Sequence, residues 1–277
     1  MIDTHMQSQR NAGHYTDSEL HEMGFASVGK NVLISRLARI YGASKMSLGD
    51  NIRIDDFAIL SGKITIGSFV HIGAFASITG GSAGVSIGDF CGMSSQSKIF
   101  ALSDDFTSGY LIGSCVPAEF RNVCEKPVVL TRHCHIGSHS LVLAGSVFEM
   151  GACLGAMSLA IGRRLKPWSF YLGNPAKKLY DIPEQKVLAL EAKLLEQIHG
   201  GGGATLKPHK IRQIHKLHQP HKPHRLGQNH PNHPNHPKLP HHPITDTPPH
   251  YLTPLASRLH RIANPTQPKT PHTRQSA

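Results

Sequence analysis

Large aliphatic residues recur at every sixth position over most of the first 160 residues, and this spacing is the strongest constraint on the fold. Neither the 3.6-residue period of a helix nor the two-residue period of a strand explains it. It is typical of a triangular solenoid, in which each six-residue unit is a short strand plus a corner and three units complete a coil. The series runs Val28, Ile34, Ile40, Leu48, Ile54, Leu60, Ile66, Ile72, Ile78, then Ile87, Met93, Ile99 and, after a gap, Leu130, Ile136, Val142, Phe148, Leu154 and Ala160.

We expect the aliphatic residue of each unit to point inward, because a three-sided prism has no other core. Four positions later the residue is often small, as at Ala58 and Ala76. Cys91 and Cys134 occupy such positions and are interpreted as small core residues. Counting 18 residues per coil predicts about six coils, interrupted once by a loop at residues 101–127. A loop of this length in a compact solenoid is usually functional.

The N-terminal segment, residues 1–27, is expected to carry one short helix. Thr16 and Glu19 have the spacing of a capping box, and Gly24 stands where a short helix would end. These signals predict a helix over residues 17–23.

The solenoid is expected to span residues 28–180 and to be followed by a C-terminal helix at 181–199. Pro183 suits the first turn of that helix, and Gly200 suits its end. The pattern predicts one apolar face that packs on the solenoid or on a neighbouring subunit. Its residues are Val187, Leu190, Leu194 and Ile198.

The formal net charge of +11 belongs to the C-terminal tail. Residues 199–277 hold 11 of the 29 Lys and Arg, one of the 18 acidic residues, 14 of the 21 His and 14 of the 19 Pro. The remainder is nearly neutral, so we expect no nucleic-acid partner. The tail has too few large apolar residues to offset the entropy of ordering, so residues 200–277 are predicted to be disordered. Its histidines leave open weak binding of nickel or zinc.

The cysteine pattern favours a reducing compartment. Five cysteines form no CxxC pair, and their odd number argues against a disulfide framework. No run of about 18 apolar residues and no secretory leader is visible, so a cytoplasmic protein without a membrane span is expected.

Several motifs occur in the order found in one enzyme family. They are residues 52–57 (IRIDDF), 103–105 (SDD), 136–139 (IGSH), 154–156 (LGA) and 173–177 (GNPAK). Over about residues 15–180 the chain resembles the hexapeptide-repeat acyltransferases, in particular bacterial sugar acetyltransferases of the galactoside/maltose type and their surface-polysaccharide branch.

The resemblance implies a left-handed parallel β-helix, with the short N-terminal helix, inserted loop, C-terminal helix and disordered tail predicted above. It also implies a homotrimer with acetyl-CoA in the crevice between subunits. The implied reaction is direct transfer of an acetyl group to a hydroxyl or amine of a sugar or nucleotide sugar, in lipopolysaccharide or surface-polysaccharide biosynthesis. A histidine acts as the general base.

The position of that base departs from the family pattern. Asp104 stands in the loop where a histidine would be expected, and an ordinary aspartate is a poor base near neutral pH. We predict that His71, next to a corner one coil earlier, is the base. Asp104 or Asp105 would reach over to fix its tautomer. The alternative is that His71 is an exposed corner histidine without a role.

The resemblance also suggests substrate-binding residues. Ser138 and Ala156 would line the pantetheine arm of acetyl-CoA, and Asp55 and Asp56 would bind the acceptor or cap corner amides. Five basic residues near the last coil suit the phosphates of the nucleotide end. They are Arg163, Arg164, Lys166, Lys177 and Lys178.

Three histidines follow the loop: His133, His135 and His139. In an extended strand His133 and His135 would face the same way and could bind a metal. We favour the interpretation that they line the subunit crevice, and we expect no metal. Trp168 is expected to stack on adenine or to cap the solenoid.

Two other functions fit the same fold. A γ-type carbonic anhydrase would need three histidines converging on zinc between subunits, and their spacing here is poor. A non-catalytic trimeric scaffold is suggested by the missing loop histidine.

Overall fold

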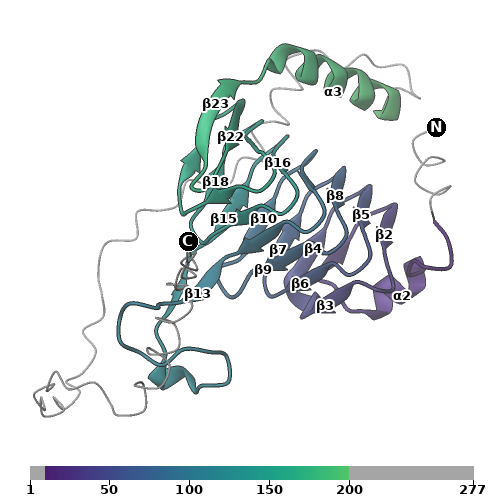
Figure 1. Ribbon diagram of the computed structural model, residues 1–277. Helices are drawn as coiled ribbons and strands as arrows, with labels where there is room; N and C mark the ends of the chain where they lie inside the picture. The colour runs from purple at the N-terminus through teal and green to yellow at the C-terminus, as the bar shows by residue number, and fades with distance from the viewer. Residues whose placement is uncertain (1–9, 200–277) are drawn as a thin grey trace, which may run out of the picture. The chain divides into compact units, whose positions relative to one another are not determined.

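The computed structural model describes residues 10–199, which belong to one compact unit. The predicted disordered tail, residues 200–277, lies outside the described residues. Most of the described chain forms a solenoid of short strands, with a helix near each end (Figure 1).

Three sheets form the faces of the solenoid. The first sheet contains β1 (Ser27–Val28), β4 (Met46–Leu48), β7 (Ile64–Ile66), β10 (Val85–Ile87), β15 (Val128–Leu130), β18 (Val147–Phe148) and β21 (Arg164–Leu165). The second sheet contains β2 (Val32–Ile34), β5 (Ile52–Ile54), β8 (Val70–Ile72), β11 (Gly92–Met93), β16 (His135–Ile136), β19 (Cys153–Leu154), β22 (Ser169–Leu172) and β23 (Lys177–Asp181). The third sheet contains β3 (Arg39–Tyr41), β6 (Ile59–Ser61), β9 (Ser77–Thr79), β12 (Lys98–Phe100), β17 (Leu141–Val142) and β20 (Leu159–Ala160).

Consecutive strands visit the three sheets in turn, so stacked coils pair in parallel. Leu48 pairs with Ile66, and Ile66 with Ile87, across β4, β7 and β10. The first sheet has seven strands, one coil more than the predicted six. The aliphatic series ends at Ala160, but Leu165 and Tyr171 continue the buried core into a final coil.

The predicted inward residues form the core. All are buried except Val28 and Ile40, which are partly buried at the N-terminal end. Ala58, Cys91 and Cys134 are buried as small corner residues, as predicted. The side chains buried in the core therefore recur every six residues, as the sequence predicts.

Close stacking of the coils explains the glycine that often follows an inward aliphatic residue. A Cβ added at Gly67 would lie 2.8 Å from the backbone nitrogen of Asp89 in the next coil, so no larger residue fits. Side chains at the same corner cap exposed amides. The Asp89 carboxylate accepts a hydrogen bond from the Ser68 amide at 2.8 Å, and Asp50 accepts one from Lys30 at 2.7 Å.

The N-terminal helix is α2 (Asp17–Glu22), and its capping box is formed as predicted. The Glu19 amide donates to Thr16 Oγ1, and the Thr16 amide donates to the Glu19 carboxylate. Leu20 of α2 is buried against the first coils. A short 3-10 helix, η1 (Ala43–Lys45), lies between β3 and β4.

The C-terminal helix is α3 (Glu184–His199), and its predicted apolar face is only partly covered within the chain, so packing on a neighbouring subunit stays a prediction. Leu190 and Ile198 are 58% and 40% exposed. The helix instead buries Glu191, which pairs with Arg132 and lies 2.9 Å from His133. Arg132 and His133 at the solenoid corner therefore hold the Glu191 side of the helix against the solenoid.

The inserted loop leaves the solenoid after β12 and projects from it (Figure 1). It contains β13 (Leu102–Asp104), the 3-10 helix η2 (Ala118–Phe120) and β14 (Val123–Glu125). β13 and β14 pair as an antiparallel hairpin. Over residues 10–199 the structure contains no helix long and apolar enough to cross a membrane.

Shortening a buried aliphatic should destabilise the solenoid strongly. Ile72→Ala removes a side chain with no exposed surface, so we expect the free energy of unfolding to fall by about 2–5 kcal/mol. Ile161→Ala, at a 51% exposed residue, should cost less than about 1 kcal/mol. Urea denaturation of both variants at one protein concentration measures the difference. Equal losses would contradict the inward assignment of Ile72.

Candidate active site

A column of polar residues runs along the outer face of the second sheet. The strand register places Arg53 beside His71, His71 beside Gly92, Gly92 beside His135 and His135 beside Cys153. Each residue precedes an inward aliphatic, so every side chain of the column points away from the core, and Gly92 contributes none. The column crosses five successive coils.

His71 and Asp55 form a hydrogen-bonded pair in this column. His71 Nε2 lies 2.7 Å from Asp55 Oδ2, and the His71 side chain is 49% exposed. Arg53 holds the same carboxylate, with its Nε 2.7 Å from Asp55 Oδ1 and its Nη2 3.2 Å from Asp55 Oδ2. The ionised Asp55 carboxylate thus holds Nε2 of His71 as a hydrogen-bond donor. Nδ1 is then the ring nitrogen that can accept a proton.

The pair keeps Asp55 ionised. Partial burial raises the pKa of this carboxyl, but the hydrogen bonds from His71 and Arg53 outweigh it, and the pKa falls to about 2. A carboxylate so held stabilises a positive charge on the neighbouring imidazole. A histidine that can accept a proton and be stabilised afterwards has the requirements of a general base.

His135 leans over Gly92 toward the His71 side of the column. A Cβ at Gly92 would lie 2.2 Å from His135 Cε1 and 2.7 Å from its Nδ1, so the ring occupies the space above the glycine. Burial, and then the charge of His71, lower the pKa of His135. Two imidazoles in different electrostatic environments therefore lie two coils apart on one face.

The predicted pairing of His71 with Asp104 or Asp105 does not occur within the chain. Asp104 binds Arg121 at 2.7 and 2.9 Å and the Gly113 amide at 3.1 Å, all inside the loop. Asp105 accepts hydrogen bonds from the amide and hydroxyl of Thr107. The loop leaves from the third sheet, whereas His71 lies on the second. Both loop carboxylates therefore bind groups within the loop and stabilise its hairpin.

The two predicted acceptor residues differ in their surroundings. Asp55 belongs to the His71 pair, while Asp56 is exposed and accepts a hydrogen bond from Ser35 Oγ at 2.5 Å. Both lie at the corner between the second and third sheets. Neither carboxylate has a corner amide among its described hydrogen bonds.

The predicted pantetheine residues lie at that same corner. Gly137 is stacked so closely on the next coil that an added Cβ would lie 2.4 Å from the Ala156 nitrogen, and Ser138 O accepts a hydrogen bond from the Met157 amide. Ser138 is half-buried and Ala156 is exposed. The two small residues therefore occupy neighbouring coils along one edge.

The five predicted phosphate-binding residues are not gathered in one cluster. Arg164 lies on β21 in the first sheet, across the prism from that corner, and pairs with Glu149 at 2.7 Å. Arg163 donates to the Ala176 carbonyl at 2.7 Å, and Lys178 pairs with Asp181 at 2.5 Å. Lys177 and Lys178 lie on the edge strand β23, and Lys166 directly follows β21.

The corner between the first and second sheets carries an aromatic ladder that sequence reasoning missed. Phe69, Phe90, His133 and Trp168 stack with centroid separations of 4.8, 5.2 and 5.7 Å. His133 has a φ of 58°, so it lies at the corner and does not face the same way as His135. Its ring instead contacts Glu191 of α3. Trp168 caps this ladder.

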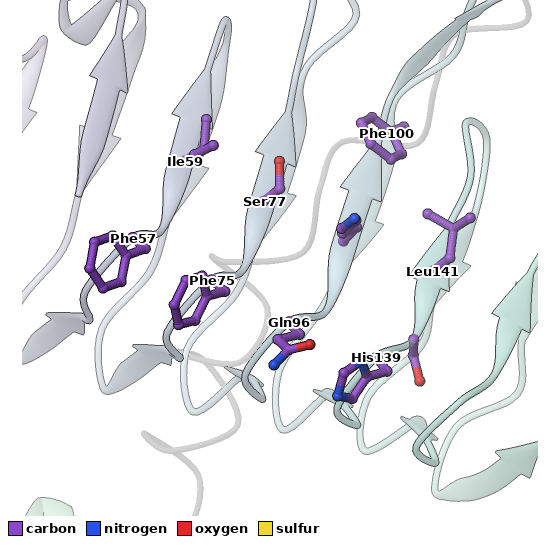
Figure 2. Close-up of a pocket in the computed structure, with 10 residues that line it drawn as sticks. Phe57, Ile59, Phe75, Ser77, Gln96, Phe100, His139 and Leu141 are labelled. Carbon is purple, nitrogen blue, oxygen red and sulfur yellow. The ribbon is translucent and has the colours of Figure 1, made fainter. Parts of the chain in front are cut away.

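A groove of about 780 Å³ lies beside the Asp55 corner, across the third sheet. Figure 2 shows Phe57 and Phe75 side by side at one edge, with Gln96 and His139 further along the same edge. The Phe57 and Phe75 rings stack at 4.8 Å and are 47% and 53% exposed. Ile59 and Leu141 line the groove on the sheet itself.

The alternative that the histidines after the loop bind a metal is not supported by their positions in the described residues. His133, His135 and His139 belong to a corner ladder, a sheet face and the opposite corner. Within residues 10–199, no three His, Cys, Asp or Glu side chains are grouped as a metal would require.

Arg53 and Gly92 were missed as members of this column, and His135 was expected to line the subunit crevice, although the spacing of all three was visible. Arg53, Gly92 and His135 each precede an inward aliphatic residue, at Ile54, Met93 and Ile136. When the coils are aligned on these aliphatic residues, all three fall in one column with His71. The hydrogen bond between His71 and Asp55 depends on side-chain rotamers, which the spacing does not predict.

Comparison with known proteins places the chain among acyltransferases, although no model of a known protein family matches it. The dTDP-4-amino-4,6-dideoxy-D-glucose acyltransferase of Escherichia coli is 36% identical over 177 residues, which are 63% of this chain and 91% of the relative. AntD, an N-acyltransferase of Bacillus cereus solved with dTDP-4-amino-4,6-dideoxyglucose and coenzyme A, is 40% identical with a TM-score of 0.65. The match covers 68% of this chain and 100% of AntD.

AntD solved with dTDP and 3-hydroxybutyryl-CoA is 41% identical, with the same TM-score, over 67% of this chain and 98% of AntD. These relatives are matched over nearly their whole length, and the match includes the solenoid. The chain belongs to the hexapeptide-repeat, left-handed β-helix acyltransferase family and is an acyltransferase.

Proposed function

We propose that this chain transfers an acyl group from a CoA thioester to the amino group of a dTDP-linked amino sugar. The observation that carries the proposal is its 40% identity to AntD, whose structure holds a dTDP-4-amino sugar together with coenzyme A. The AntD complex with 3-hydroxybutyryl-CoA extends the candidate donors beyond acetyl-CoA. Lipopolysaccharide or another surface polysaccharide remains the proposed destination of the sugar, and the cytoplasm the proposed compartment.

His71 is the proposed general base, with Asp55 in the place that the loop aspartates were expected to fill. The acceptor nitrogen forms a bond to the thioester carbonyl carbon, and the carbon–sulfur bond then breaks. His71 takes one proton from the nitrogen and delivers it to the leaving CoA thiolate. The Asp55 carboxylate stabilises the imidazolium in between. Most of the remaining rate enhancement comes from alignment of the two substrates and from oxyanion donors.

Asp104 is proposed to act on the site of a neighbouring subunit. Other AntD structures carry substitutions at one serine and at one aspartate that lies ten positions further along that chain. Ser94 and Asp104 have the same separation here, as do Ser95 and Asp105. Since the loop projects from the solenoid, Asp104 would meet a serine of this corner only across an interface.

We propose that the working form is a homotrimer. Leu37, Phe57, Phe75 and Met157 are all at least 47% exposed and lie along the corner between the second and third sheets. The loop adds exposed Phe106, Leu111 and Phe120. Apolar edges of this extent are typical of surfaces that are covered by a partner.

Turnover with defined substrates tests the proposed reaction. We expect thiol release from acetyl-CoA or 3-hydroxybutyryl-CoA with dTDP-4-amino-4,6-dideoxyglucose, and mass spectrometry should find the N-acylated sugar. A UDP-linked amino sugar is the matched control for the nucleotide. Absence of transfer to every dTDP-amino sugar in such a panel would refute the proposal.

Replacing the base should lower turnover and leave the fold intact. His71→Gln is expected to reduce kcat by about 100-fold or more, as expected for a lost general base. His21→Gln, a histidine change on α2, should have no effect. Thiol-release kinetics measure both, and thermal unfolding checks folding. Near-normal kcat in His71→Gln would remove His71 from the mechanism.

A charge at the apolar edge should break the trimer. In Phe75→Asp a carboxylate would be buried if a neighbour covers this corner, so we expect the variant to dissociate at concentrations where the wild type is trimeric. Leu190→Asp changes an equally exposed leucine on α3 and should leave the trimer intact. Sedimentation velocity distinguishes the species. A monomeric wild type would refute the assembly.

A further inference from the structure

The groove across the third sheet, called here the third-sheet groove, contains one strongly basic side chain. Among the described residues that line it, Lys98 of β12 is the only Lys, Arg, Asp or Glu. Its volume of about 780 Å³ is within the range of small-molecule sites. Lys98 is exposed, and within residues 10–199 it forms no ion pair. A cation between largely apolar walls favours an anionic ligand.

The third-sheet groove and His71 lie on two faces of the solenoid that meet at one corner. Phe57 and Phe75 lie at this corner, which is the proposed contact of the homotrimer. Three triangular prisms that meet at such a corner fill only half of the space around the three-fold axis. Each of the three remaining wedges is bounded by the third-sheet groove of one subunit and by the His71 face of the next. A substrate in the wedge therefore touches both.

The carboxylates around this wedge have partners within their own chain. Asp55 and Asp104 are held by arginines. Asp56 and Asp105 accept hydrogen bonds from hydroxyl groups. A diphosphate brings several ionised oxygens that have no such partner, so it is the stronger counterion for Lys98.

The position of Lys98 along the solenoid identifies which substrate brings that diphosphate. His71 pairs with Gly92 and Ser77 with Lys98, so the coils of His71 and Lys98 are successive and about 4.8 Å apart along the axis. In an acyl-CoA the whole pantetheine arm separates the thioester from the diphosphate. In a dTDP-linked amino sugar only the sugar ring separates the amine from the diphosphate. Phosphates one coil away from the base therefore belong to the acceptor.

We propose that the third-sheet groove binds the pyrimidine nucleoside diphosphate of the acceptor, with Lys98 on the diphosphate and Phe100 packed on the pyrimidine ring. This inference rests on the proposed dTDP-amino sugar and on the proposed homotrimer. Lys98 and Phe100 flank the buried Ile99, so both side chains face outward into the groove, about 7 Å apart along β12. The deoxyribose that joins base and diphosphate spans a comparable length. Figure 2 shows Phe100 at the end of this strand opposite Gln96.

Titration calorimetry of the full chain with dTDP tests the phosphate contact. Lys98→Met should raise the Kd of dTDP by about 10- to 100-fold, the effect of losing a hydrogen bond to a charged group. The KM for acetyl-CoA should stay within about twofold. The control is Lys45→Met, which changes an exposed lysine on η1 outside the groove and should leave the Kd of dTDP unchanged.

Thymidine, which has no phosphate, separates the base contact from the phosphate contact. Phe100→Leu should weaken thymidine and dTDP alike, by about 10-fold, because it removes the stacking surface. Lys98→Met should leave thymidine within about twofold of its wild-type affinity. Ligand-observed NMR measures the weak thymidine complex, and sedimentation velocity checks the trimer. If Lys98→Met does not assemble, Phe100→Leu decides.

The outcomes distinguish the inference from the proposed function. An unchanged Kd of dTDP in Lys98→Met, unchanged thymidine binding in Phe100→Leu, or a loss that falls on acetyl-CoA would overturn the inference. A wild-type chain that neither binds dTDP nor acylates a dTDP-amino sugar would instead overturn the proposed function.

Mixed trimers test whether the groove and the base meet across subunits. When His71→Gln and Lys98→Met chains are co-expressed, some wedges combine the intact His71 of one chain with the intact Lys98 of another. Random assembly should restore kcat/KM to about a quarter of the wild-type value. Trimers of either variant alone contain no such wedge. If the mixture is no more active than the two variants measured separately, the placement of the nucleotide between subunits is wrong.

Discussion

The structure depends on burying one large aliphatic side chain in each six-residue unit. A prism three strands wide has room for little else inside, so Ile54, Ile72, Met93 and Ile136 stack in a single file. That file sets the register of every coil, because shifting a strand by one residue would turn its aliphatic to solvent. Glycines such as Gly67 then allow the coils to approach as closely as strands do.

In-register stacking turns sequence spacing into spatial proximity, and the candidate site follows from it. The residues before the stacked aliphatics face outward at the separation of neighbouring strands. Arg53, Asp55 and His71 can therefore form a charged cluster on a regular sheet without any special loop. Gly92 interrupts the column of side chains and gives His135 its space. The same stacking builds the aromatic ladder at one corner and the exposed phenylalanines at another.

Polar interactions decided the features that depart from the repeat. Arg132, held between Asp89 and Glu191, orients α3 through a buried ion pair, although the apolar pattern of the helix favoured another face. In the loop, Asp104 binds Arg121 and folds a hairpin that points away from the solenoid. A buried or half-buried charge is costly without a partner. In both places the ion pair that formed decided the arrangement, and the spacing of apolar residues did not.

The sequence alone determined the solenoid, its inward residues, both helices and the acyltransferase family, because each follows from spacing or from motifs that local backbone geometry requires. His71 as the base and Asp55 as a residue that binds the acceptor stay predictions. The sequence did not show which carboxylate His71 reaches within the chain, it misassigned the direction of His133, and it missed the final coil and the burial of Glu191 on α3. Those features depend on side-chain rotations and on contacts between residues as far apart as Arg132 and Glu191. A one-dimensional pattern contains no information about which of several possible partners a charged side chain will reach, so the tertiary structure alone decided them.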